Sequence, residues 1–192
     1  MPPSRKSIRA GAEEKSPATG GEEVALVAHC LLNHLTRVRG LDPLAFSPAG
    51  PLVQLPCPEA LYLGAERWAV TRNQLDVPQF RRFCRSLIVH YADLLEMLAK
   101  EGVRVRVVGV AGSPSCGVQT TSSGYAGGRV HEVEHEHVPG QGIFMEELTA
   151  ELESRQIPFE AEEVGKKRMN EAEFGCLPGI EPFGRGERDR FE

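Results

Sequence analysis

The feature that most constrains the fold is a long amphipathic segment that leads directly into a Val-rich run. Between Pro78 and Lys100 apolar residues recur with the helical period, at Phe80, Phe83, Cys84, Leu87, Ile88, Tyr91, Leu94, Leu95 and Leu98. Asp76 offers an N-cap, Pro78 suits the first turn and Gly102 ends the helix. The run at 103–110 is typical of a strand. A helix followed at once by such a strand predicts a βαβ crossover in a parallel sheet.

Other apolar segments extend this prediction to a whole domain. Strands are expected from Glu23 onward, over 52–55 and over 157–164, and a second helix is expected over 143–155. The first run is unbroken rather than alternating, which is typical of a strand buried on both faces. The predicted fold is α/β: a single small three-layer sandwich with a mostly parallel, Rossmann-like sheet and helices on both faces.

Composition predicts one structured domain between two tails. Residues 1–22 are rich in Gly, Ser, Pro, Lys and Glu without periodicity, which predicts a disordered N-terminal tail. Residues 23–165 contain every predicted element. Residues 166–192 show little periodicity and are expected to form a loosely packed C-terminal tail.

Charge and hydropathy argue against several classes of protein. A net charge of -5 gives no electrostatic case for DNA binding, although Arg37, Arg39, Arg67 and Arg72 suggest a local basic groove. No apolar run approaches the ~20 residues that cross a bilayer, and no secretory h-region is seen. Five cysteines, an odd number, without an export signal argue against a disulfide framework. We therefore expect a cytoplasmic protein; its oligomeric state does not follow from the sequence.

Three cysteines each follow a predicted strand. Cys30 follows the first strand, Cys57 the second and Cys116 the third. Because the carboxyl ends of parallel strands converge on one crevice, we expect the three thiols to meet there. Three thiolates in one crevice indicate a metal centre with one open coordination position. Their spacing does not identify the metal, since no Cys-x-x-Cys pair of a zinc ribbon or ferredoxin loop is present.

The alternative for any free cysteine is a packing position in the core, and local sequence separates the two. One cysteine lies between two prolines in Pro56-Cys-Pro-Glu59. Another lies in Gly112-Ser-Pro-Ser-Cys-Gly117, where glycines permit close approach of a ligand. Neither setting is typical of a core position. Cys84, in contrast, belongs to the apolar stripe of the long helix and is interpreted as a core residue.

These motifs resemble those of the bacterial thiouracil desulfidases and of the broader, mostly uncharacterised family that contains them. The likeness extends over residues 24–152 and rests on Cys30-Leu-Leu-Asn with Arg37 and Gly40 downstream, Cys57-Pro-Glu59, and Ser113-Pro-Ser-Cys-Gly117. The resemblance implies a [4Fe-4S] cluster held by Cys30, Cys57 and Cys116, with the fourth iron free to bind substrate sulfur. It also implies that Glu59 is the acid/base and that Ser113 and Ser115 orient the substrate.

The implied reaction is non-redox hydrolysis of a small thiolated compound, such as a thionucleobase or thioamide, with release of sulfide. A thiocarbonyl sulfur is soft and prefers iron, which polarises the C=S bond for attack by water activated by Glu59. The segment Ala60-Leu-Tyr-Leu-Gly-Ala-Glu-Arg-Trp68 differs from the Gly-Gly and Pro-Arg-rich segment usual in those enzymes. We therefore expect this chain to share the cofactor of those enzymes more closely than it shares their substrate.

Two other functions stay open from the sequence. One is a non-catalytic iron-sulfur or metal-binding protein that stores or transfers sulfur or iron. The other is a zinc-binding or plain α/β protein whose cysteines are structural. His131, His135 and His137 alternate with Val and Glu, which fits zinc binding but better fits an exposed strand or a hairpin at 129–138.

Overall fold

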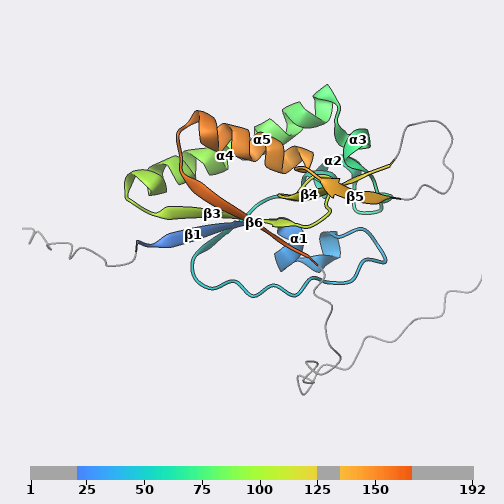
Figure 1. Cartoon of the computed structure of the whole chain (residues 1–192), viewed down its shortest axis with the longest axis horizontal. Helices are drawn as coiled ribbons and strands as arrows, with labels where there is room; N and C mark the ends of the chain where they lie inside the picture. The colour runs from blue at the N-terminus through green and yellow to red at the C-terminus, as the bar shows by residue number, and fades with distance from the viewer. Residues whose placement is uncertain (1–20, 125–134, 166–192) are drawn as a thin grey trace, which may run out of the picture.

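Four parallel strands form the centre of the molecule, in the order β2-β1-β3-β6 (Figure 1). The computed structural model describes residues 21–124 and 135–165. The strands are β1 (Glu23–Val27), β2 (Leu52–Gln54), β3 (Arg104–Val110) and β6 (Phe159–Val164). Leu26 of β1 is in register with Val53 on one side and Val107 on the other. Since β1 has a partner strand at each edge and a layer over each face, its apolar run is continuous, as predicted.

The two long helices cover one face of this sheet. These helices are α4 (Pro78–Lys100) and α5 (Ile143–Ser154), and Figure 1 shows both above the strands. Each connects parallel strands in the same direction across the sheet, from β2 to β3 and from β3 to β6. Right-handed crossovers that advance in one direction must lie on one face. The prediction of a mostly parallel α/β sandwich is confirmed.

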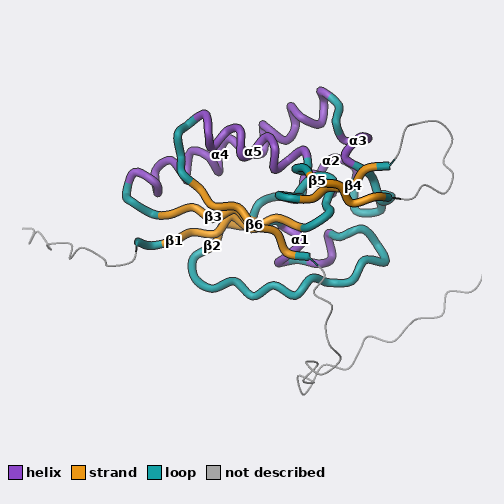
Figure 2. The backbone as a smooth tube through the Cα atoms, in the orientation of Figure 1, coloured by secondary structure: helices purple, strands orange, loops and turns teal. Residues whose placement is uncertain are grey.

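The opposite face carries the connection from β1 to β2, which runs in the reverse direction across the sheet. It contains α1 (His29–Leu32), the 3-10 helix η1 (His34–Thr36) and a long extended segment over residues 37–51 (Figure 2). A right-handed connection that crosses the sheet in the opposite direction to the other two must lie on the opposite face. Both faces of the sheet therefore carry helices, as predicted, but those of the second face are short and the rest of this layer is irregular chain.

Helix α4 packs through the stripe that its sequence predicts. Every third or fourth residue along one side is buried, namely Phe80, Cys84, Ile88, Ala92 and Leu95. Its bounds agree with the prediction residue for residue. Its N-cap is Val77 rather than Asp76, which instead forms salt bridges with Arg72 and Arg81. The expectation of an Asp76 cap was wrong because these two arginines hold its carboxylate.

A two-stranded antiparallel ribbon stands beside the main sheet. It pairs β4 (Thr120–Ser123) with β5 (Glu136–Pro139). A hairpin at 129–138 was expected, but β5 pairs with residues 120–123, and residues 125–134 lie outside the described part of the chain. Two short helices, α2 (Pro58–Leu63) and α3 (Arg72–Leu75), complete the connection from β2 to α4.

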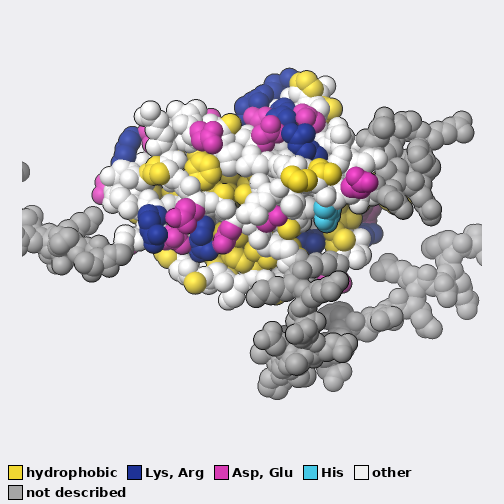
Figure 3. Space-filling model, in the orientation of Figure 1, with side chains coloured by type: hydrophobic (Ala, Val, Ile, Leu, Met, Phe, Trp, Pro, Cys, Tyr) yellow, Lys and Arg dark blue, Asp and Glu magenta, His cyan; other side chains and the backbone are white. Residues whose placement is uncertain are grey.

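Ion pairs tie the helical layer together. Arg81 of α4 pairs with both Glu146 and Glu147 of α5, and Arg72 of α3 also reaches Glu146. Figure 3 shows basic and acidic side chains intermixed over these helices. In the described residues, none of the helices combines the length and the hydropathy that a membrane span requires. The predicted tails, residues 1–22 and 166–192, lie outside the described part of the chain apart from Gly21 and Glu22.

Candidate functional site

A cavity of about 570 Å³ opens at the carboxyl edge of the parallel sheet. The loops that follow β1, β2 and β3 all contribute to its wall, as does Gly165 directly after β6. The extended segment after η1 adds Val38, Leu41 and Leu44 from the second face. This edge is where open parallel sheets bind ligands, and the volume is in the range of small-molecule sites.

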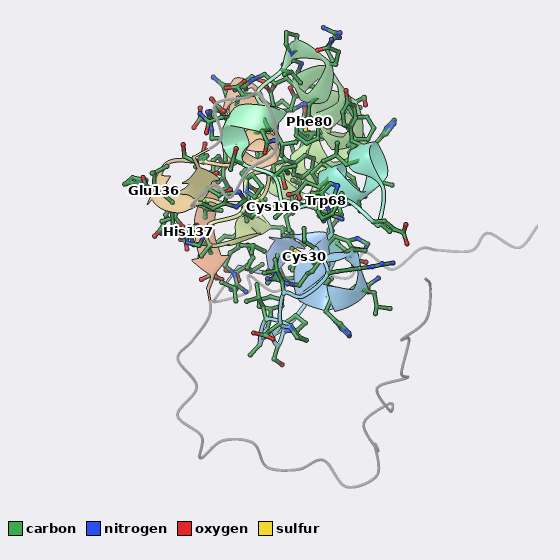
Figure 4. All side chains as sticks on the ribbon, turned by 90° about the vertical axis from the view of Figure 1, so that its right-hand side faces the viewer. Cys30, Trp68, Phe80, Cys116, Glu136 and His137 are labelled. Atoms are coloured by element: carbon green, nitrogen blue, oxygen red, sulfur yellow. The ribbon has the colours of Figure 1, made fainter. Side chains whose placement is uncertain are left out.

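The three predicted cysteines line this one cavity. Cys30 lies in α1, directly after β1, and Cys57 is the N-cap of α2, with its Sγ 3.4 Å from the Ala60 backbone nitrogen. Cys116 lies in the loop after β3 and is held by a hydrogen bond from the Val110 backbone N–H to its carbonyl oxygen at 2.8 Å. Figure 4 shows Cys30 and Cys116 near the centre of this end of the molecule. The structure thus brings together thiols from three parts of the chain.

The three thiols are near enough for electrostatic interactions between them to affect their pKa values. Burial, with a smaller contribution from Cys57, raises the pKa of the Cys30 thiol to about 11. Burial also raises the pKa of Cys57. Burial and then repulsion from Cys30 and Cys57 raise the pKa of Cys116 well above its ordinary value. A bound cation reverses this effect, because it favours the thiolate form.

Glu59 is a buried carboxylate held on both oxygens. Ser115 Oγ donates a hydrogen bond to Glu59 Oε1 at 2.5 Å. Arg67 Nε donates to Glu59 Oε2 at 3.2 Å, and the side chains of this ion pair are 5% and 8% exposed. Arg67 also donates to the Thr36 carbonyl oxygen at 2.9 Å, which fixes the guanidinium. Glu59, Ser115 and Arg67 all line the cavity.

Ser113 and Ser115 have different surroundings in the Ser-Pro-Ser-Cys loop. Ser113 Oγ accepts a hydrogen bond from the Cys116 backbone N–H at 3.0 Å, so it shapes the loop that presents this cysteine. Ser115 is 1% exposed, and its Oγ also lies 3.5 Å from Cys116 Sγ. Its hydroxyl therefore connects a carboxylate to a thiol.

The cysteine loop is clamped from two sides. Glu163 of β6 accepts hydrogen bonds from the backbone N–H groups of Val118, Gln119 and Thr120, at 2.8 to 3.1 Å. On the other side, a Cβ added at Gly142 would lie 2.6 Å from the Ser115 carbonyl oxygen and 2.9 Å from the Cys116 nitrogen. Only a residue without a side chain lets α5 begin this close to the loop. Neither clamp was predicted from the sequence.

Two histidines of the predicted cluster reach the cavity. His135 and His137 line it, and the ring of His137 packs against Gly112. His131 lies outside the described residues. Within the described ranges, no three or more His, Cys, Asp or Glu side chains are arranged to hold one metal ion. The exposed strand favoured for this segment agrees with β5, which contains His137.

The four arginines expected to form a basic groove separate into two groups. Arg39 pairs with Glu66 at the surface, and Arg72 pairs with Asp76 and Glu146 in the helical layer. Arg37 and Arg67 do line the cavity. Cys84 is fully buried in α4, which confirms its interpretation as a core residue.

Fold and site together define a small α/β protein with a three-cysteine cavity at the carboxyl edge of its sheet. The chain is similar to an uncharacterized protein of the archaeon Methanocaldococcus jannaschii, with 26% identity over 164 residues. That alignment covers 80% of this chain and 93% of the archaeal protein. No family model and no solved structure matches the chain. This relative is itself uncharacterised, so the relation of the chain to the desulfidases stays a prediction from the motifs.

Proposed function

We propose that this protein is a [4Fe-4S]-dependent desulfidase-like enzyme that removes sulfur from a small thiolated compound by hydrolysis. The observation that carries the proposal is the cavity that Cys30, Cys57 and Cys116 share with Glu59 and Ser115. The four described cysteines are free thiols, which suits chemistry in a reducing cytoplasm.

The donor set suits an iron-sulfur cluster, because three cysteine thiols line one cavity. Cluster thiolates bind separate irons, so they need not converge on one point. Cys30, Cys57 and Cys116 would be the ligands. When bound, such a cluster with three protein ligands supplies an open, Lewis-acidic iron that binds and polarises a thiocarbonyl.

Glu59 is the residue that we propose to move protons. Arg67 holds Oε2, so Oε1 is the oxygen available for proton transfer, and Ser115 Oγ is hydrogen-bonded to it. Water attacks the thiocarbonyl carbon as Glu59 accepts its proton, directly or through the Ser115 hydroxyl. The C–S bond then breaks as the new hydroxyl group loses its proton to form the C=O bond, and this proton and the one held by Glu59 both leave with the sulfur. A thioamide and water become an amide and hydrogen sulfide, without net transfer of electrons.

Sulfide release tests this function. Anaerobically reconstituted protein is incubated with 2-thiouracil, 4-thiouracil, 2-thioorotate and thiobenzamide, and sulfide and the desulfurated product are measured. We expect equal amounts of both from at least one compound with the wild-type protein. A Glu59→Gln variant with the same iron content should release about 10²- to 10⁴-fold less per unit time. Iron-loaded wild-type protein that releases no sulfide would instead favour the non-catalytic iron-sulfur protein.

A further inference from the structure

Two buried polar atoms at the cavity lack hydrogen-bond partners. They are Arg37 Nε and Ser122 Oγ, and within the described ranges no other buried side-chain nitrogen or oxygen is left unpaired. Both residues line the cavity. An unpaired buried polar group is costly and therefore rare, so two at one cavity point to a ligand that pairs with both.

Ser122 stands out among the hydroxyl residues of β4. Thr120 donates to Glu163, Thr121 to the Ser113 carbonyl oxygen, and Ser123 to Asn73. Ser122 is 5% exposed and has no such partner. Its register partner on β5 is His137, so both side chains lie on the same face of the ribbon, toward the cavity. The ribbon thus contributes to the cavity wall one residue whose buried hydroxyl is unpaired.

Arg37 differs from the other arginine at the cavity. The charge of Arg67 is balanced by Glu59, which makes that pair neutral overall. Arg37 forms no salt bridge with a carboxylate of the described residues, although it lies near enough to Cys30 to lower the pKa of that thiol. Among the described residues, the Arg37 guanidinium therefore has no carboxylate partner at the cavity.

We propose that the cavity selects a small substrate with a carboxylate, which Arg37 binds, and a second polar group, which Ser122 binds. This inference rests on the proposed function, because the same molecule carries the thiocarbonyl that is hydrolysed. A planar carboxylate pairs well with a guanidinium, which donates in the same plane.

Binding of sulfur-free probe pairs tests the inference without turnover. Affinities of the reconstituted protein are measured by calorimetry for benzoate and benzamide, nicotinate and nicotinamide, and orotate and uracil. We expect at least one carboxylate to bind about 10- to 100-fold more tightly than its neutral partner. Arg37→Gln should abolish that preference and Arg37→Lys should keep part of it. Arg39→Gln, a surface control, should leave it unchanged, and Ser122→Ala should weaken both members of the pair.

Several results would overturn the inference. These are equal binding within every pair, a preference that survives in Arg37→Gln, or phenyl phosphate that binds more tightly than benzoate through Arg37. Loss of iron in Arg37→Gln with the preference intact would show that this arginine serves the cysteines instead. The two proposals fail separately. A carboxylate preference in protein that releases no sulfide refutes the desulfidase, whereas equal kcat/KM for 2-thioorotate and 2-thiouracil refutes the carboxylate specificity alone.

Discussion

Ser115 Oγ lies 2.5 Å from Glu59 Oε1, and this hydrogen bond joins the loop after β3 to the helix after β2. The strand between β2 and β3 in the sheet is β1, whose carboxyl end leads into Cys30. The bond therefore spans the end of β1 and places a carboxylate, a hydroxyl and three thiols around one cavity.

Loss of this hydrogen bond should slow catalysis more than it weakens binding. Ser115→Ala removes the donor to Glu59 but none of the cysteines, so iron content should stay at the wild-type level. A hydrogen bond to a charged group is worth about 1.5–3 kcal/mol, which corresponds to a kcat that is about 10- to 160-fold lower. The measurement is steady-state sulfide release, with Ser154→Ala on the exposed side of α5 as the control. A change confined to KM would contradict the proton-transfer role.

Arg67 should matter for stability as well as for the site. Arg67→Met leaves the buried Glu59 carboxylate without its cation, which should lower the free energy of unfolding by about 3 kcal/mol. Arg39→Met breaks the exposed pair with Glu66 and should cost at most about 1 kcal/mol. Urea titrations of both variants provide the measurement. Equal midpoints for the two variants would mean that the buried pair contributes no more than the surface pair.

A methyl group at Gly142 should disturb the site from a distance. Gly142→Ala pushes against the Ser115 carbonyl and the Cys116 nitrogen, and backbone there has little freedom to yield. We expect lower iron retention after reconstitution and a less stable fold. Gly21→Ala is the matched control, because the nearest atom to its added Cβ is a backbone oxygen at 3.5 Å. Identical iron content in the two variants would show that the loop tolerates the displacement.

Glu163 should make part of the stability sensitive to acid. Burial raises the pKa of Glu163, but hydrogen bonds from Gln119, Thr120 and Val118 outweigh it and hold the pKa below its ordinary 4.5. A carboxyl whose folded pKa is lowered stabilises the protein above the unfolded pKa and loses this effect as the pH falls through the folded value. Glu163→Gln should cost about 2 kcal/mol at pH 7.

That cost should shrink as the pH falls below about 4.5, because the wild-type carboxyl then becomes protonated as well. Unfolding free energies measured at pH 7 and near pH 3 for wild type and variant provide the comparison. Glu160→Gln, an exposed change on the same strand, serves as the control. A difference between wild type and Glu163→Gln that is independent of pH would contradict the stated role of the carboxylate.

The elements with a strong local pattern could be predicted from the sequence. Helix α4 has an apolar stripe over six turns, so its bounds were predicted correctly. The convergence of Cys30, Cys57 and Cys116 also follows from local signals, because each lies just beyond a strand and parallel strands share one carboxyl edge.

Features that depend on contacts between distant segments could not be predicted in the same way. Nothing near Arg67 in the sequence indicates that its guanidinium lies between Glu59 and the Thr36 carbonyl. Strand β4 consists of hydroxyl residues and does not alternate with apolar ones, so nothing in the sequence indicated that Ser122 lines the cavity. The irregular layer over residues 37–51 was not predicted for a similar reason. Its position on the second face follows from the order of the strands in the sheet, and its own sequence has no periodic pattern that would indicate it.

Iron and acid-labile sulfide per chain, measured on anaerobically reconstituted protein, test the central claim most directly. Wild type should hold about four of each, and Cys30→Ala, Cys57→Ala and Cys116→Ala should each lose most of both. Cys84→Ala, a buried cysteine away from the cavity, should keep the wild-type content. Folded wild-type protein without iron, or a Cys116→Ala variant that retains all of it, would contradict the three-cysteine cluster.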